Sequence, residues 1–374
     1  MLILAAVLAI FVYGIIAAML GTILPGISQR FNLTPKQNGN IAMAQAVGLM
    51  IGGFFVGPLM DTEGAKVGLL LGLGLIAASL FGLKFANGYG SVAMLMFILG
   101  CGGGAIVTGA NTLPPSISIE GLTTPGVFNL LNLFFGLGGL VTPLIAARLF
   151  HNQSGKLLMF AGTLALITFI DHAVTTMPAA SGKVAFQASL VTDLLSKPAL
   201  WSLSLILFLY VACEVGVWNW LVRHLIAQGV NDKKALTILS LGFALGLLIG
   251  RVAVSPILSS VSPERVLLGS GVLMAITTFA MLREHSETLA GATVFLAGIA
   301  MAPVFPTALS VVNARFPDSA ATATGIATTA GWFGLVVSSP LIGGLAGTDP
   351  KRLKTALLVI PACSIIMAII ALTL

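Results

Sequence analysis

The chain has 374 residues, of which 57% are hydrophobic and only 8% are charged, against roughly a quarter charged in an average soluble domain. This composition excludes a soluble globular protein, and Lys and Arg residues scattered singly, for a net charge of +6, argue against a nucleic-acid partner. The three cysteines have neither CxxC nor Cys/His ligand spacing, so we expect no disulfide framework, no metal and no cofactor.

Apolar runs that are broken by glycine, proline or charge predict twelve helices of the length that crosses a hydrocarbon core of about 30 Å. Segments such as 67–83 and 292–309 are apolar on all sides, which excludes the alternating pattern of a β-barrel. The sequence therefore predicts an all-α membrane protein. In chain order the expected helices span 3–24, 38–60, 66–84, 91–113, 125–147, 157–177, 199–222, 235–258, 264–282, 288–312, 320–346 and 354–373.

The connector from Pro178 to Pro198 is both long and polar enough to be a linker between domains. The sequence thus predicts a six-helix half over 1–178, a cytoplasmic linker over 179–198 and a second six-helix half over 199–374.

An internal repeat relates the two halves. Residues 49–70 align without a gap with 247–268 at an offset of 198, and the same offset carries Phe97 and Gly100 onto Phe295 and Gly298. The second expected helix maps onto the eighth and the fourth onto the tenth. An even number of helices separates the copies, so they are parallel repeats, an arrangement found in transporters that rock two halves about a central site.

The run GPLMDTEGAK from Gly57 to Lys66 resembles the G-x-x-x-D-x-x-G-x-[RK] loop between helices 2 and 3 of the major facilitator superfamily. Residues 208–221, 128–144 and 302–310 are similar to helices 7, 5 and 10 of its fucose:proton symporter group. The resemblance implies a twelve-helix transporter whose loop latches one conformation. It assigns gating to the charges of this loop and of its repeat partner, which are Asp61, Lys66 and Arg251; the alternative is that they are solvated loop charges.

Two acids of fucose permeases are missing. Gly21 stands where that group has an aspartate four residues before the proline of helix 1, and Val107 stands where it has a glutamate four residues before an asparagine. Fucose specificity, and proton coupling by the same residues, therefore cannot be carried over.

Glu214 lies near the middle of the seventh expected helix, where an ionisable side chain indicates function by default. Tyr210 and Trp218 lie four residues to either side and share its helical face. An aromatic–carboxylate–aromatic face suits a sugar, and we expect Glu214 to bind solute and to carry the coupling proton. The alternative is that Glu214 bonds a neighbouring helix and that the aromatic rings only pack.

Other polar side chains in the apolar segments are sparse, as in a ligand site, although such groups also join transmembrane helices. We expect the solute to contact the amides among them as well, namely Gln45, Asn111, Asn129, Asn132 and Asn219.

We expect a monomeric secondary transporter, in a bacterial inner membrane, that moves a small polar solute by alternating access. A sugar is the first choice, driven by protons, by sodium or by its own gradient. An exporter or facilitator of amphipathic drugs, lipids or another metabolite stays open. An intramembrane enzyme is not expected, because neither GxSxG nor HExxH occurs.

One pattern opposes the orientation that the resemblance implies: with the N-terminus inside, twelve of the 18 Lys and Arg fall on the outer side.

Overall fold

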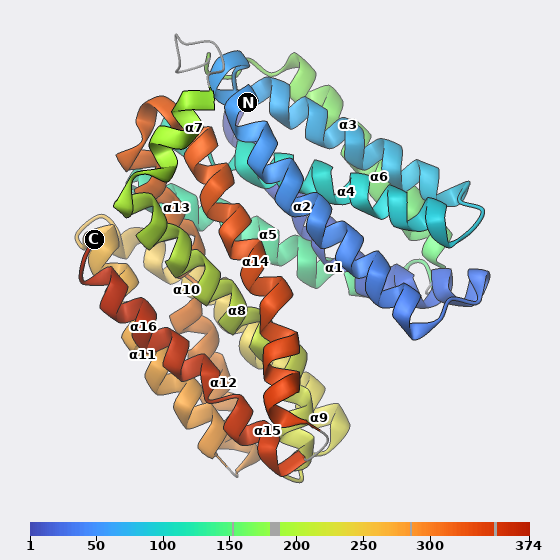
Figure 1. The fold of residues 1–374 in the computed structure, drawn as a ribbon, viewed down its shortest axis with the longest axis vertical. Helices are drawn as coiled ribbons and strands as arrows, with labels where there is room; N and C mark the ends of the chain where they lie inside the picture. The colour runs from blue at the N-terminus through green and yellow to red at the C-terminus, as the bar shows by residue number, and fades with distance from the viewer. Residues whose placement is uncertain (152, 180–187, 285, 348–349) are drawn as a thin grey trace. The chain divides into compact units, whose positions relative to one another are not determined.

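The computed structural model describes residues 1–151, 153–179, 188–284, 286–347 and 350–374, and the regular structure in these ranges is helical throughout (Figure 1). Among the described residues, twelve helical segments are long and apolar enough to cross a membrane. The expected fold class is confirmed, with boundaries that differ from the expected ones by several residues. Eight of the 20 residues of the expected linker, 180–187, lie outside the described residues, and the eight that follow form a short helix, α7 (Ala188–Leu195).

The chain divides into two compact units, and each takes one short segment from the other half of the sequence. Unit 1 comprises Met1–Ser118, Leu131–Ser196 and Asn313–Thr329. Among its helices, α2 packs against α4, α4 packs against α3, and α3 packs against α6. They are α1 (Leu2–Phe31), α2 (Pro35–Glu63), α3 (Ala65–Lys84), α4 (Tyr89–Ala110), α6 (Ser154–Val174) and most of α5 (Thr124–Arg148).

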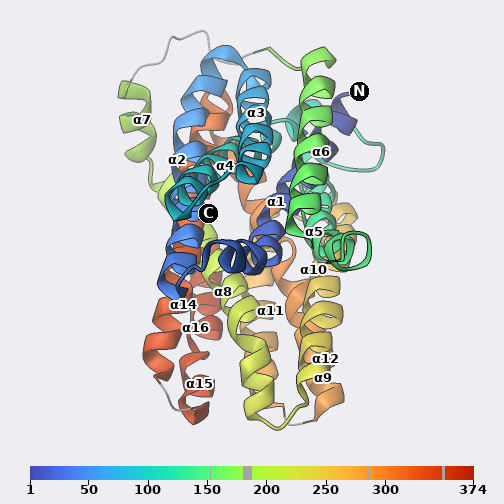
Figure 2. The ribbon, with the colours of Figure 1, turned by 90° about the vertical axis from the view of Figure 1, so that its right-hand side faces the viewer.

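Unit 2 comprises Ile119–Leu130, Lys197–Val312 and Ala330–Leu374. Its α11 packs against α12 and α16, and α12 packs in turn against α10 (Figure 2). Its helices are α8 (Pro198–Ala227), α9 (Asp232–Thr237), a π-helical turn (Ile238–Ala244), α10 (Leu245–Ile257), α11 (Pro263–Arg283), α12 (Glu287–Met301), most of α13 (Val304–Arg315) and of α14 (Ala320–Ala346), α15 (Pro350–Ala356) and α16 (Val359–Ala371).

The ends of α2 follow from its sequence. Thr34 caps the first turn, because its hydroxyl accepts from the Gln37 amide and the Gln37 side chain accepts from the Thr34 amide, with Pro35 at the first helical position. At the other end Gly64 has φ of 94°, a conformation that glycine adopts without steric cost. A single residue therefore separates α2 from α3.

Glycines bring α2 and α4 into backbone contact. A Cβ on Gly48 or Gly52 would collide with the carbonyl oxygens of Phe97 and Cys101, and one on Gly100 or Gly104 would collide with those of Gln45 and Leu49. Small residues four apart allow such close approach between transmembrane helices. Gly100 and Gly104 thus serve the close packing that is typical of small residues in transmembrane helices.

The same contact recurs in unit 2 at the offset of 198 residues. A Cβ on Gly246 would collide with the carbonyl oxygen of Phe295, and one on Gly298 would meet that of Phe243. These pairs are the counterparts of Gly48 with Phe97 and of Gly100 with Gln45. The internal repeat is therefore present in the packing of α10 on α12 as well as in the sequence.

Candidate functional site

Asp61 lies in the last turn of α2 and binds the first turn of α14, in the segment of α14 that belongs to unit 1. Its carboxylate accepts from the backbone amides of Ala321 and Thr322 at 3.0 and 2.8 Å, and from the Thr322 hydroxyl. The side chain is only 5% exposed. A carboxylate on the free amides of a helix N-terminus is stabilised both by hydrogen bonds and by the helix dipole. Asp61 is thus not a solvated loop charge.

Asp61→Asn should weaken this contact, because the amide keeps only one acceptor oxygen and turns an NH₂ group toward N–H donors. We expect slower initial uptake and an altered reactivity of single cysteines introduced along α14, without loss of folded protein. Both are measured in proteoliposomes with labelled solute and a maleimide.

Glu63→Gln is the matched control, since Glu63 is an exposed acid on the same last turn of α2. It should leave uptake and labelling unchanged. Asp61→Asn with the kinetics and labelling of the wild type would sink the gating role of Asp61.

Lys66 does not face Asp61 but holds the end of α6. Its ammonium donates to the carbonyl oxygens of Ala173 and Thr175 at 2.7 and 3.0 Å. A cation at the C-terminus of a helix satisfies carbonyl groups that lack partners within the helix. Lys66 therefore fixes the α2–α3 turn against α6 within unit 1.

Glu214, Tyr210 and Trp218 share one face of α8, as their spacing predicts. The half-buried Glu214 carboxyl lies near the Tyr210 hydroxyl and the Trp218 indole and interacts with both. Tyr210 is 1% exposed, whereas Trp218 is 39% exposed. The stripe therefore runs from a buried tyrosine to an accessible tryptophan.

Arg251 is the charged partner of this stripe. Sequence reasoning placed it with the loop charges, and that position is wrong: Arg251 lies inside α10 and is 4% exposed. It interacts electrostatically with Glu214 and with Tyr210. The rule that was applied to Glu214 predicts this position as well: an ionisable side chain within an apolar segment usually pairs with another ionisable side chain.

Further aromatic rings surround this group within unit 2. Trp218 packs edge-on against Phe243 with ring centroids 5.4 Å apart. Phe305 lies between Tyr210 and Trp332, at centroid distances of 6.3 and 6.1 Å. Phe243, Phe305 and Trp332 were not among the expected site residues because, unlike Tyr210 and Trp218, none of them lies four residues from an ionisable side chain.

Two of the predicted amides in unit 1 bind each other. The Asn132 side chain donates to the Asn111 side-chain oxygen at 3.0 Å, and the Asn111 amide donates to the Val107 carbonyl at 2.8 Å. Gln45 is also buried, on α2. The first of these bonds joins α5 to the end of α4, and the second lies within the end of α4, so the pair has a structural role.

The amides of unit 2 also have protein partners. Asn129 donates to the Thr307 hydroxyl at 3.0 Å, which ties the start of α5 to α13. Asn219 donates to the Ser339 hydroxyl of α14 at 2.7 Å and is exposed. Asn219 follows Trp218 directly and is the more accessible of the two amides.

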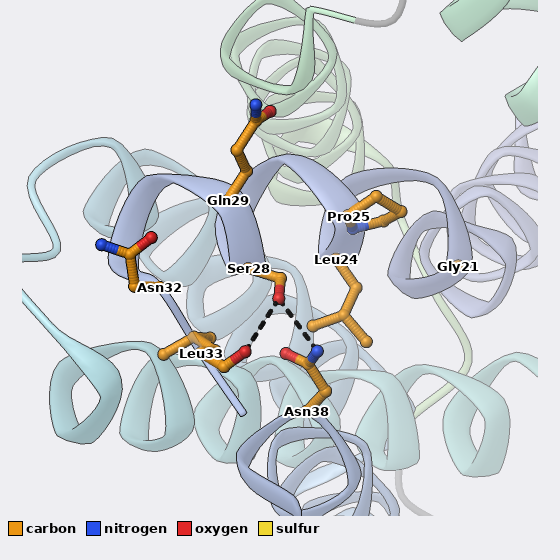
Figure 3. Close-up of a pocket in the computed structure, with 8 residues that line it drawn as sticks. All are labelled: Gly21, Leu24, Pro25, Ser28, Gln29, Asn32, Leu33 and Asn38. Carbon is orange, nitrogen blue, oxygen red and sulfur yellow. Dashed lines mark hydrogen bonds between the residues drawn. The ribbon is translucent and has the colours of Figure 1, made fainter. Parts of the chain in front are cut away.

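A pocket of about 640 Å³ lies at the end of α1 in unit 1. In Figure 3 the Ser28 hydroxyl lies between the Asn38 amide, which donates to it at 2.9 Å, and the Leu33 carbonyl. All of its lining residues are uncharged: Gly21, Leu24, Pro25, Ser28, Gln29, Asn32, Leu33 and Asn38. With Gly21 in its wall, the pocket lacks the acid that fucose permeases carry at this position.

A family model described as Major Facilitator Superfamily matches residues 6–339. The chain belongs to this superfamily. It is therefore a multi-pass membrane protein of a transporter family, and the repeat and the Gly57–Lys66 motif are features of a superfamily member.

Individual superfamily members show lower similarity. The glucose/mannose transporter GlcP of Bacillus subtilis is 24% identical over 357 residues, covering 91% of this chain and 86% of GlcP. A gallate transporter of Pseudomonas putida is 25% identical over 408 residues, covering 96% and 88%.

The fold resembles that of a solved superfamily structure. FucP, the fucose:proton symporter of Escherichia coli, in its outward conformation has a TM-score of 0.84 at 20% identity, covering 99% of this chain and 98% of FucP. At this identity the likeness shows only that the folds are similar. The chemical class of the solute therefore depends on the side chains of this chain.

Proposed function

We propose that this superfamily member is a secondary active transporter that takes up a small polar organic solute, a sugar in first place, together with a proton carried by Glu214. The observation that carries the proposal is the Tyr210–Glu214–Trp218 face, where a carboxyl group lies between aromatic rings within an apolar helix. Aromatic faces bind the C–H side of a sugar ring, and the carboxyl accepts from its hydroxyl groups.

We assign solute contacts to Tyr210, Glu214, Trp218 and Asn219 in unit 2. The proposal also keeps Gln45, Asn111, Asn129 and Asn132 as contacts, with Asn111, Asn129 and Asn132 giving up a present partner to bind solute. Gating stays with Asp61 and Lys66. The similarity to a glucose/mannose transporter supports a sugar, and the similarity to a gallate transporter supports a small organic solute more generally.

A counterflow screen in proteoliposomes tests the proposal. Neutral sugars, sugar acids, aromatic acids and amphipathic drugs are each offered as unlabelled solute inside and labelled solute outside. We expect exchange with a member of the sugar classes and none with the drugs. Exchange of drugs or lipids alone would replace the proposal with the exporter alternative.

The proposed location is the bacterial inner membrane, with the N-terminus in the cytoplasm. Glu120 follows four membrane-crossing segments and Lys233 follows seven, and both are exposed. On a cysteine-free background, Glu120→Cys should be protected from an impermeant maleimide in intact cells, while Lys233→Cys should be labelled. The opposite pattern would show that the Lys and Arg distribution, and not the superfamily motif, sets the orientation.

A further inference from the structure

The pair formed by Glu214 and Arg251 constrains the charge of the solute. Arg251 is 4% exposed on α10, and the titratable groups that interact with Glu214 among the described residues are Tyr210 of its own helix and Arg251. Guanidinium stays protonated under all relevant conditions. Buried charges are tolerated when they are paired, so Arg251 needs an anion beside it throughout the transport cycle.

Protonation of Glu214, which the proposed function requires, removes that anion. A neutral sugar could not replace it, because hydroxyl groups supply no charge. A carboxylate could, since its two oxygens match the planar fork of a guanidinium. Tyr210 interacts electrostatically with both members of the pair, and Phe305 and Trp332 continue the aromatic wall beside it.

We infer that the solute is a sugar acid, a hydroxylated monocarboxylate whose carboxylate takes the place of Glu214 as the counter-charge of Arg251 while Glu214 holds the proton. This inference rests on the proposed function and narrows its solute class. The net charge of the site is then the same in both states. The empty site holds the Arg251 cation and the Glu214 anion, and the occupied site holds the Arg251 cation, the solute anion and a neutral Glu214. One proton enters with each monoanion, and the transport step moves no net charge.

Matched solutes that differ only in the carboxylate test the inference on the wild-type protein. Glucose and glucuronate, and galactose and galacturonate, are compared by counterflow in proteoliposomes. We expect the acid of a pair to exchange with an apparent affinity at least about tenfold better than that of its neutral partner. Exchange of the neutral sugar alone would overturn the inference and leave the proposed function standing, whereas no exchange of any member would overturn both.

Substitution of Arg251 gives the second test. Arg251→Gln should weaken exchange of the acid about 30-fold or more and weaken any exchange of the neutral sugar much less, while Arg251→Lys should restore part of the loss. The exposed Arg265→Gln on α11 is the matched control and should behave as the wild type. Equal losses for acid and neutral sugar in Arg251→Gln would show that Arg251 only holds α8 to α10.

Glu214→Gln provides a readout that does not require transport. With the Glu214 carboxylate gone, Arg251 lacks this counter-charge until a solute supplies one, so glucuronate should raise the thermal midpoint of Glu214→Gln more than that of the wild type.

The driving force of uptake gives a complementary check. Uptake of the acid should respond to a pH gradient and not to a potassium-diffusion potential, and uptake driven by the potential would contradict the charge balance.

Discussion

Glu214→Gln should abolish uphill solute uptake and the pH dependence of transport while preserving downhill exchange. Glutamine has the shape of protonated glutamic acid but cannot release a proton, so the variant is fixed in the proton-loaded state. The measurement compares accumulation of labelled solute under an imposed pH gradient with counterflow at equal pH. Accumulation should fall to the level of protein-free liposomes, while the counterflow rate should stay within about an order of magnitude of the wild type.

Glu264→Gln makes the same chemical change in the first turn of α11 and should accumulate solute normally. Accumulation by Glu214→Gln against the gradient, with the pH dependence of the wild type, would refute the coupling role. Weaker apparent affinity with unchanged pH dependence would show that Glu214 binds the solute and does not carry the proton.

Gly104→Ala should destabilise the protein strongly, because the contact between α2 and α4 leaves no space for a methyl group. The added Cβ would collide with the carbonyl oxygen of Leu49 and would lie 2.5 Å from the Gly53 nitrogen, both of which are backbone atoms of α2. The helices would have to separate, and overpacking of this kind costs about 1–3 kcal/mol or more. We expect a clear drop in the thermal midpoint in detergent and a lower yield of monodisperse protein.

Gly90→Ala is the matched control on the same helix, since a Cβ there would meet no atom within 4 Å. It should leave the midpoint unchanged or raise it slightly, because alanine favours a helix over glycine. Equal midpoints for Gly104→Ala and Gly90→Ala would contradict the close packing of α2 on α4.

Hydrophobicity alone predicted the helices, because a segment that crosses a bilayer must be apolar over about 20 residues. The offset of 198 also predicted which glycines have equivalent positions in the packing. It pairs Gly52 with Gly250 and Gly100 with Gly298, and all four lie at the helix contacts that recur in the two units. Helix ends were less predictable, since α1 continues through Pro25 to Phe31.

The partners of charged residues could not be predicted from spacing. Asp61 binds amides of Ala321 and Thr322, 260 and 261 positions away, and no local pattern connects these segments. Arg251 was assigned to the wrong place because the repeat pairs it with Gly53, which lies before the Gly57–Lys66 motif. The motif that indicated the positions of Asp61 and Lys66 therefore gives no information about Arg251. The Glu214 face was predictable because its three residues lie on one helix, whereas the arginine beside it comes from another.

Proton movement driven by solute alone is the most direct test of coupled transport through Glu214. Proteoliposomes that contain a pH-sensitive dye are prepared at equal pH and without a membrane potential, and the solute that exchanges best in the counterflow screen is added outside. We expect acidification of the lumen by the wild-type protein and none by Glu214→Gln, although both exchange labelled solute. Entry of solute through the wild-type protein without any change in internal pH would contradict proton coupling.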